Sequence, residues 1–358
     1  MKEFEPIDPK QKKRKKKSDA SLGFVIVIIV LCLTLLASLY ITLYSLKMYN
    51  SIRDEQIEAS KQVTYTQEQL DRMLEEARLE SQMITEARFK NELKDTAENN
   101  NGIVTMLRKL YPEYFVYYDS NHYVFVEIDE SLPQANYTLD NLVANQGFIE
   151  YHKDGQVLSV KGIDVSKYQG DVDWVKVKES GVDYVMLRLG LRGYETGKLV
   201  LDENFEANIQ GALDAGLEVG VYFFTQAITD AEAREEAEFV CAALEPYQIT
   251  YPVSIDVEDL YNDKARSYGQ SKESRTQCAI TFMECMKRAG YKTSIYGNLN
   301  TFTKLVDVNK LGDYDKWFAY YGDDIYYPYE ISMWQYTDKG RVDGIEGDVD
   351  LNITFPVN

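Results

Sequence analysis

The sequence has 358 residues and a formal net charge of −19, and its length predicts two or three domains. Residues 1–19 carry eight Lys/Arg against four Asp/Glu, a net +4, which leaves −23 on residues 20–358. So acidic a remainder argues against nucleic acid as a partner, because its phosphates would be repelled.

The N-terminal region combines a basic run at residues 10–17 with an uncharged stretch of 27 residues from Ala20 to Leu46. This stretch exceeds both the roughly 20 residues that cross a bilayer and the roughly 7–15-residue core of a signal peptide, and no small-residue cleavage site follows it. Alone, the basic run could be a nuclear signal or a nucleic-acid patch. Next to an apolar span, however, a basic run determines which end of the span stays in the cytoplasm. We therefore expect a cytoplasmic tail at residues 1–19 and a single transmembrane helix in the lipid bilayer at residues 20–46, with the remainder outside the cell.

Residues 47–100 are polar and predict a helical stalk. Apolar residues recur at heptad spacing at Val63, Leu70, Ala77 and Ile84. Glu80 and Asn91 interrupt this seam. The pattern leaves open a single helix and a parallel coiled-coil homodimer through the stalk.

Residues 103–160 predict a small α+β module with no evident chemistry. Met106–Tyr111 reads as a short helix, and Tyr114–Tyr118 and Tyr123–Ile128 read as the strands of a hairpin. A second hairpin is expected to turn at residues 153–155. We interpret the tyrosines of this module as packing residues.

Residues 161–358 alternate between strand and helix patterns. The predicted strands are Gly162–Val165, Tyr184–Gly190, Val219–Phe224, a run ending at Glu258, Thr293–Tyr296, Lys316–Tyr321, Ile331–Tyr336 and Asp348–Leu351. The predicted helices are Asp173–Ser180, Glu203–Ala215, Asp230–Leu244 and Lys272–Ala289. This alternation predicts parallel strands joined by crossovers. Eight strands in so short a segment predict an α/β fold, an incomplete TIM-like (β/α) barrel with its site at the carboxyl ends of the strands.

Asp256 and Glu258 end an apolar run at residues 251–258. In a strand, positions two apart face the same side, about 6–7 Å apart at Cα. Two like charges so close are costly, whereas a glycosidase needs a pair of carboxyl groups at about this separation. The alternative is two solvated acids at a strand end.

Other acids and aromatic residues also end predicted strands. The candidate acids are Asp164, Asp256, Glu258 and Asp350, and the candidate substrate-binding residues are Tyr168, Arg188, Tyr222, Tyr296, Trp317, Tyr320, Trp334 and Gln335. Aromatic faces stack on sugar rings and leave hydroxyl groups free to hydrogen-bond. For each aromatic residue, core packing is the alternative.

The two histidines, His122 and His152, both precede residue 161. Zinc hydrolases usually need a His ligand, and Ser or Cys hydrolases need a His base. A glycine-rich phosphate loop is also absent from the sequence. The sequence therefore predicts carboxylate chemistry with no metal and no cofactor.

Three motifs resemble those of the glycoside hydrolase family 25 lysozymes, the Chalaropsis-type N-acetylmuramidases. They are Gly-Ile-Asp-Val-Ser-Lys-Tyr-Gln-Gly at residues 162–170, Ile-Asp-Val-Glu at residues 255–258, and Trp-Gln-Tyr with Gly-Ile-Glu-Gly-Asp-Val-Asp-Leu-Asn within residues 334–352. The resemblance covers Lys161 to Phe355 and leaves residues 1–160 unmatched. It implies a flattened barrel of about eight strands and cleavage of the β-1,4 bond between N-acetylmuramic acid and N-acetylglucosamine in peptidoglycan.

The resemblance also implies roles for the acids. Glu258 matches the general acid that protonates the leaving oxygen, and Asp256 matches the residue that orients the N-acetyl group or stabilises developing positive charge. Asp164 and Asp350 match the other two active-site acids. Many family members have a histidine after the third-strand tyrosine, where this chain has Phe after Tyr222, a departure that concerns subsite contacts.

These observations predict a membrane-anchored peptidoglycan hydrolase that remodels the cell wall, with an extracellular catalytic domain. A non-catalytic glycan-binding scaffold on a membrane stalk is the main alternative, and a different glycosidase on a similar barrel is another. The spacing of Asp256 and Glu258 lies between the values for retaining and inverting enzymes, and substrate-assisted catalysis is also open.

Overall fold

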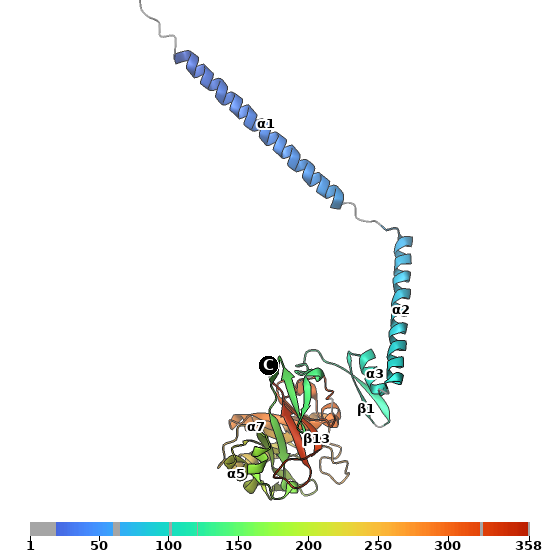
Figure 1. Cartoon of the computed structure of the whole chain (residues 1–358), viewed down its shortest axis with the longest axis vertical. Helices are drawn as coiled ribbons and strands as arrows, with labels where there is room; N and C mark the ends of the chain where they lie inside the picture. The colour runs from blue at the N-terminus through green and yellow to red at the C-terminus, as the bar shows by residue number, and fades with distance from the viewer. Residues whose placement is uncertain (1–18, 60–64, 100–101, 120, 323–324, 357–358) are drawn as a thin grey trace, which may run out of the picture. The chain divides into compact units, whose positions relative to one another are not determined.

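The computed structural model describes residues 19–59, 65–99, 102–119, 121–322 and 325–356 (Figure 1). The chain divides into two compact units, the first reaching Asn91 and the second running from Glu92 to the C-terminus. Each unit is described separately below.

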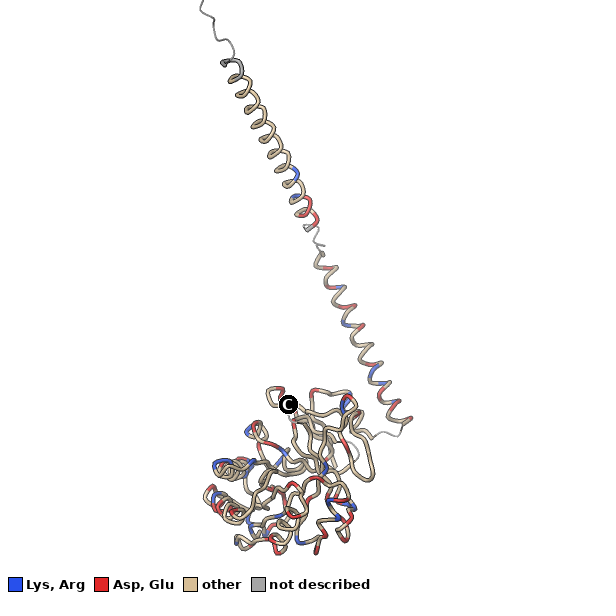
Figure 2. The backbone as a smooth tube through the Cα atoms, turned by 60° about the vertical axis from the view of Figure 1, so that its left-hand side comes forward, with Lys and Arg blue, Asp and Glu red and all other residues tan. Residues whose placement is uncertain are grey.

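The first unit is helical. Helix α1 (Asp19–Ala59) contains the one stretch of the described chain, Gly23–Glu58, that is long and apolar enough to cross a membrane. Helix α2 (Gln67–Glu98) begins at a capping box, in which the side chains of Thr66 and Gln69 each accept the other's backbone N–H. Figure 2 shows charged residues of both signs along α2, in contrast to the uncharged first part of α1. Within the predicted stalk, residues 47–59 and 67–98 are helical, whereas Tyr65 and Thr66 are not in a helix and the heptad position Val63 lies outside the described residues.

The second unit contains a closed barrel of eight strands. The barrel strands are β6 (Lys161–Val165), β7 (Tyr184–Arg192), β9 (Glu218–Phe224), β10 (Val253–Asp256), β11 (Thr293–Asn298), β12 (Asp315–Ala319), β13 (Met333–Gly340) and β14 (Val349–Thr354). They follow the order β6-β14-β13-β12-β11-β10-β9-β7, and pairing of β6 with β7 closes the ring. A short strand, β8 (Leu199–Leu201), pairs antiparallel with β7 outside the ring. The predicted TIM-like α/β fold is confirmed.

The prediction of uniformly parallel strands is wrong for the last strand. Strand β14 runs antiparallel to both β13 and β6, whereas the other barrel pairs are parallel. Residues 341–348, which join β13 to β14, contain no helix. Without a crossover the chain can only return alongside β13 in the opposite direction.

Helices cover the first part of the barrel and give way to short turns later. The longer elements are α4 (Trp174–Glu179), α5 (Phe205–Asp214), α6 (Asp230–Leu244) and α7 (Lys272–Arg288), and the short ones are η2 (Lys167–Gln169), the π-helical turn η3 (Thr301–Leu305) and η4 (Val308–Leu311). A further short turn, η1 (Leu139–Asn141), precedes the barrel. Helix α6 has the predicted bounds, because Thr229 caps its first turn by accepting the backbone N–H of Glu232.

The barrel interior is filled by Tyr184, Met186, Trp317 and Met333. Gly162 makes room for one of these side chains, since a Cβ at this position would lie 2.1 Å from Cζ of Tyr184. The glycine that opens the first motif therefore has a packing role at the floor of the barrel.

Residues 103–160 form small elements that belong to the same compact unit as the barrel. They are α3 (Ile103–Leu110), the antiparallel pair β1 (Tyr114–Asp119) and β2 (His122–Glu127), and the sheet of β3 (Leu142–Asn145), β4 (Phe148–Lys153) and β5 (Gln156–Val157). Phe115 stacks on Tyr326 at 5.1 Å between ring centroids, and the Tyr137 hydroxyl donates to the Tyr327 carbonyl at 2.7 Å. The module and the barrel thus share one hydrophobic core.

Candidate active site

The four candidate acids line one cavity of about 250 Å³ at an end of the barrel. Asp164 lies on β6 and Asp256 is the last residue of β10. Glu258 follows two residues after β10, because the strand ends earlier than predicted. Its neighbour Val257 is nevertheless held in extended register by its N–H bond to the Tyr296 carbonyl at 3.1 Å. Asp256 and Glu258 therefore still reach the same cavity.

Asp350 and Asp164 face each other across the antiparallel pair of β14 and β6. Asp164 is fixed by two side-chain amides, since Gln335 Nε2 and Asn352 Nδ2 each donate to its Oδ2 at 2.8 Å. The antiparallel return of β14 is therefore what brings Asp350 and Asn352 to the site.

The two amides are themselves oriented by aromatic side chains. Trp317 Nε1 donates to Asn352 Oδ1 at 2.8 Å. The hydroxyl groups of Tyr296 and Tyr321 donate to Gln335 Oε1 at 2.9 and 3.0 Å. Each amide consequently presents its NH₂ group to Asp164. A flipped amide would place its carbonyl oxygen against the carboxylate and could not donate this hydrogen bond.

Burial raises the pKa of both strand-paired acids. The pKa of Asp164 rises to about 6, although the hydrogen bonds from Asn352 and Gln335 oppose the shift. The pKa of Asp350 rises to about 8, through burial first and then through the charge of Asp164. At neutral pH these acids cannot all be ionised together, because like charges in a low-dielectric cavity repel.

Asp256 and Glu258 are hydrogen-bonded to each other, and the pKa of each is raised mainly by burial. Repulsion from Glu258 further raises the pKa of Asp256, whereas the hydrogen bond from Asp256 lowers that of Glu258. Burial, rather than repulsion by Asp256, is therefore the main cause of the raised pKa of Glu258. Asp256 Oδ1 is buried and has no hydrogen-bond partner among the described residues.

Most of the predicted substrate-binding residues lie around the same cavity. Besides the acids, its lining includes Tyr168, Arg188, Tyr222, Tyr296, Trp317 and Gln335. Tyr320 lines an adjoining cavity instead. Trp334 lines neither, because it points away from its neighbour Gln335 in the strand and is fully buried in the core, with its Nε1 donating to the Tyr320 carbonyl at 2.7 Å.

Arg188 is held at the cavity by a buried acid. Its Nε and Nη2 atoms both lie 2.7 Å from Asp202 Oδ2. The guanidinium carbon lies 4.9 Å from the ring centroid of Tyr168, which is 77% exposed. This arrangement places a fixed positive charge and an exposed aromatic face at one edge of the cavity.

Several contributors were not predicted, among them Ser166 and Gln169, which line the cavity. Asn352 follows Asp350 by two residues, so strand periodicity could have placed it on the same face. Tyr321 adjoins a predicted residue, Tyr320, but points to the other side. Asp202 comes from the segment between β8 and α5, and no sequence signal identifies it. The described residues contain no group of three or more His, Cys, Asp or Glu side chains arranged to hold a metal ion.

Comparisons with known proteins identify the family of residues 163–345. The family model described as glycosyl hydrolases family 25 matches residues 163–345, just over half of the chain. The autolytic lysozyme of Clostridium acetobutylicum is 28% identical over 199 residues, covering 54% of this chain and 55% of that protein. Lysozyme M1 of Streptomyces globisporus is 27% identical over 54% of this chain and 67% of its own length.

Other similar proteins extend the comparison. The uncharacterized protein YegX of Escherichia coli K12 is 28% identical over 54% of this chain and 69% of its own length. The solved structure of the modular autolysin LytC from Streptococcus pneumoniae, in complex with a synthetic peptidoglycan ligand, has a TM-score of 0.50 at 22% identity and covers 67% of this chain and 66% of that one. That likeness supports the fold. From the extent of the family match, this chain belongs to glycosyl hydrolase family 25.

Proposed function

We propose that this protein is a peptidoglycan hydrolase that cleaves the β-1,4 bond between N-acetylmuramic acid and N-acetylglucosamine. The observation that carries the proposal is the convergence of Asp164, Asp256, Glu258 and Asp350 on one cavity of a family 25 barrel. The names of the lysozyme and autolysin relatives support the same substrate class.

In the proposed mechanism, Glu258 protonates the leaving glycosidic oxygen. Burial favours its neutral form, so the carboxyl group holds a proton at a pH where an exposed glutamate would have lost it. Asp256 offers its unpartnered Oδ1 as an acceptor for the substrate's acetamido N–H, or stabilises positive charge at the sugar ring. Asp164, fixed by two amides, supplies negative charge near the developing cation, while Asp350, with a pKa of about 8, holds a proton beside it at neutral pH.

The test is digestion of purified peptidoglycan by the full chain in detergent, followed by mass spectrometry of the products. We expect loss of turbidity and new reducing ends on N-acetylmuramic acid. Reducing ends on N-acetylglucosamine would indicate a different glycosidase. Binding without cleavage would favour the alternative function, a glycan-binding scaffold.

We further propose that residues 20–46 anchor the protein in the cell membrane, with residues 1–19 in the cytoplasm and residues 47–358 outside. The length and apolar composition of α1 support the span, and the basic run at residues 10–17 supports the orientation. Such an anchor suits remodelling of the cell's own wall. The homodimer through the stalk stays a prediction, supported by the exposed apolar residues Leu70, Met73 and Ile84 along the heptad seam of α2.

Protease added to intact spheroplasts should digest the barrel and spare the N-terminal tail. The reason is that only residues beyond the span would be accessible from outside. Immunoblots with tags at each terminus measure both outcomes, and detergent-permeabilised cells, in which both tags are lost, are the control. Loss of the N-terminal tag from intact spheroplasts would refute the orientation, and release of the uncleaved chain into the medium would refute the anchor.

A further inference from the structure

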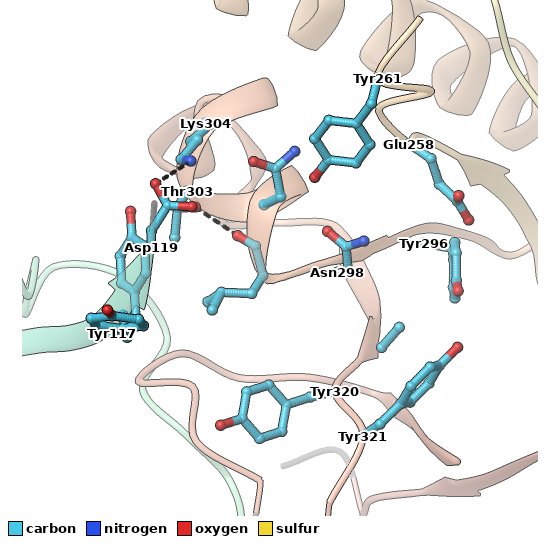
Figure 3. Close-up of a pocket in the computed structure, with 14 residues that line it drawn as sticks. Tyr117, Asp119, Glu258, Tyr261, Tyr296, Asn298, Thr303, Lys304, Tyr320 and Tyr321 are labelled. Atoms are coloured by element: carbon cyan, nitrogen blue, oxygen red, sulfur yellow. Dashed lines mark hydrogen bonds and ion pairs between the residues drawn. The ribbon is translucent and has the colours of Figure 1, made fainter. Parts of the chain in front are cut away.

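A second cavity, of about 420 Å³, adjoins the one that holds the four acids. Glu258, Tyr296 and Tyr321 line both cavities, so the two are continuous at Glu258. Figure 3 shows Glu258 and Tyr296 on one side of the second cavity, with Asp119 and Lys304 across from them. We call it the hairpin cavity, after the residues of the β1–β2 hairpin that line it: Tyr117, Tyr118 and Asp119.

The end of strand β1 is fastened to the barrel. Asp119 Oδ2 lies 2.6 Å from Nζ of Lys304 on the π-helical turn η3, an ion pair drawn in Figure 3. The hydrogen bond from this interaction raises the pKa of Lys304, so the lysine is charged across the physiological range. Two residues earlier, Tyr117 is buried in the common core. The hairpin is therefore a fixed wall of the cavity.

The lining suits a carbohydrate. Tyr118 is 56% exposed and Tyr261 is 78% exposed, so both aromatic rings are accessible. Amide and hydroxyl groups for a sugar's polar substituents come from Asn298, Asn300 and Thr303. Aromatic faces with neighbouring polar groups match the mixed apolar and polar surface of a pyranose ring.

Tyr261 is held in place by an unusual backbone turn. Its φ of 50° lies in the left-handed region, which bulky residues rarely adopt. The side chain of Asp259 accepts the Tyr261 backbone N–H at 2.9 Å and stabilises the turn. Such strain is concentrated at functional sites, and here the turn brings an aromatic ring to the cavity only three residues after Glu258.

We propose that the hairpin cavity binds the part of the glycan strand on the leaving-group side of the cleaved bond. This inference rests on the proposed function. A general acid must lie next to the oxygen that joins two sugars, and Glu258 lies where the two cavities meet. Asp164, Asp256 and Asp350 line only the first cavity, so the sugar that develops positive charge belongs there. The next sugar, an N-acetylhexosamine, then extends into the hairpin cavity.

The test compares Tyr118→Ala with wild type on peptidoglycan octasaccharides stripped of stem peptides. We expect KM to rise about 3–10-fold, the effect of losing one aromatic contact, with kcat unchanged, because the contact exists in both ground and transition states. Tyr118→Phe keeps the ring and should restore KM. Tyr268→Ala, at an exposed tyrosine that lines neither cavity, is the matched control.

Calorimetric titration of the same octasaccharide into Glu258→Gln chains, with and without Tyr118→Ala, gives a second readout that does not depend on turnover. A 3–10-fold weaker affinity of the double variant than of Glu258→Gln alone supports the subsite. This result would stand even if the wild type cleaved nothing, and only the proposed function would then fail. Unchanged affinity and KM for Tyr118→Ala would overturn the subsite while leaving the proposed function standing. An equal loss in Tyr268→Ala would overturn it as well.

Discussion

The Glu258→Gln chain is expected to lose peptidoglycan cleavage by at least the roughly 10²–10⁴-fold attributed to general acid catalysis. Glutamine keeps the size and shape of the side chain but has no acidic proton to give. Because Glu258 lies where both cavities meet, no other described glutamate can replace it at the glycosidic oxygen. The measurement is the initial rate of reducing-end release from purified peptidoglycan.

Two controls accompany this variant. Glu238→Gln makes the same change at an exposed glutamate of α6, outside both cavities, and should retain full activity. Unchanged near-ultraviolet circular dichroism shows that the fold survives in Glu258→Gln. A rate for Glu258→Gln close to that of the wild type would reject Glu258 as the acid.

The Asp256→Asn chain should have a lower kcat/KM and a high-pH limb displaced toward acid. The two contacting carboxyl groups titrate as a pair, and the active form holds one proton. Loss of that last proton is unfavourable, because it leaves two negative charges in contact. The pKa for this step is therefore raised, and it is the pKa that the high-pH limb reports. With asparagine at position 256 the pair has only one titratable carboxyl group, so its single proton is lost at lower pH.

The pH profile of kcat/KM on soluble glycan fragments measures this displacement. Asp348→Asn is the matched control, since Asp348 is an acid of the third motif that pairs with Arg341 at 2.7 Å and lies outside the cavity. Full activity with an unchanged profile in Asp256→Asn would show that Asp256 and Glu258 do not communicate.

Much of the barrel follows from local sequence patterns. Buried strands such as β10 read as short apolar runs, and helices such as α6 and α7 carry recognisable caps at Thr229 and Ser271. Four acids at strand ends could be placed together because strand ends of a barrel converge. The strands and helices were thus predicted from patterns within a few residues, and the site from the rule that the strand ends of a barrel converge.

The remaining features depend on contacts between distant parts of the chain. Trp334 and Gln335 are adjacent in sequence, and only the observed pairing of β13 decides which one faces the cavity. The module of residues 103–160 showed no chemistry in its own sequence. Its role as a wall arises from the pair of Asp119 and Lys304, which are 185 residues apart. A single sequence carries no local pattern for such a contact.

The buried acids also affect the conformational stability of the protein. Asp164 and Asp350 have folded-state pKa values of about 6 and about 8, above their ordinary value near 3.8 in the unfolded chain. At these two positions the native state therefore holds more protons than the unfolded state, so their contribution to the free energy of unfolding is greatest in acid and is lost as pH rises through about 6 and then about 8. Asparagine at position 350 does not titrate, so Asp350→Asn should increase the free energy of unfolding at neutral pH. Each kcal/mol gained should raise the melting temperature by about 2–4 °C, and the rise should be smaller in acid. Calorimetry that finds the same gain at both pH values would contradict this linkage. A cavity that holds protons on buried acids thus contributes more to the resistance of the fold against unfolding in acidic surroundings than in alkaline ones.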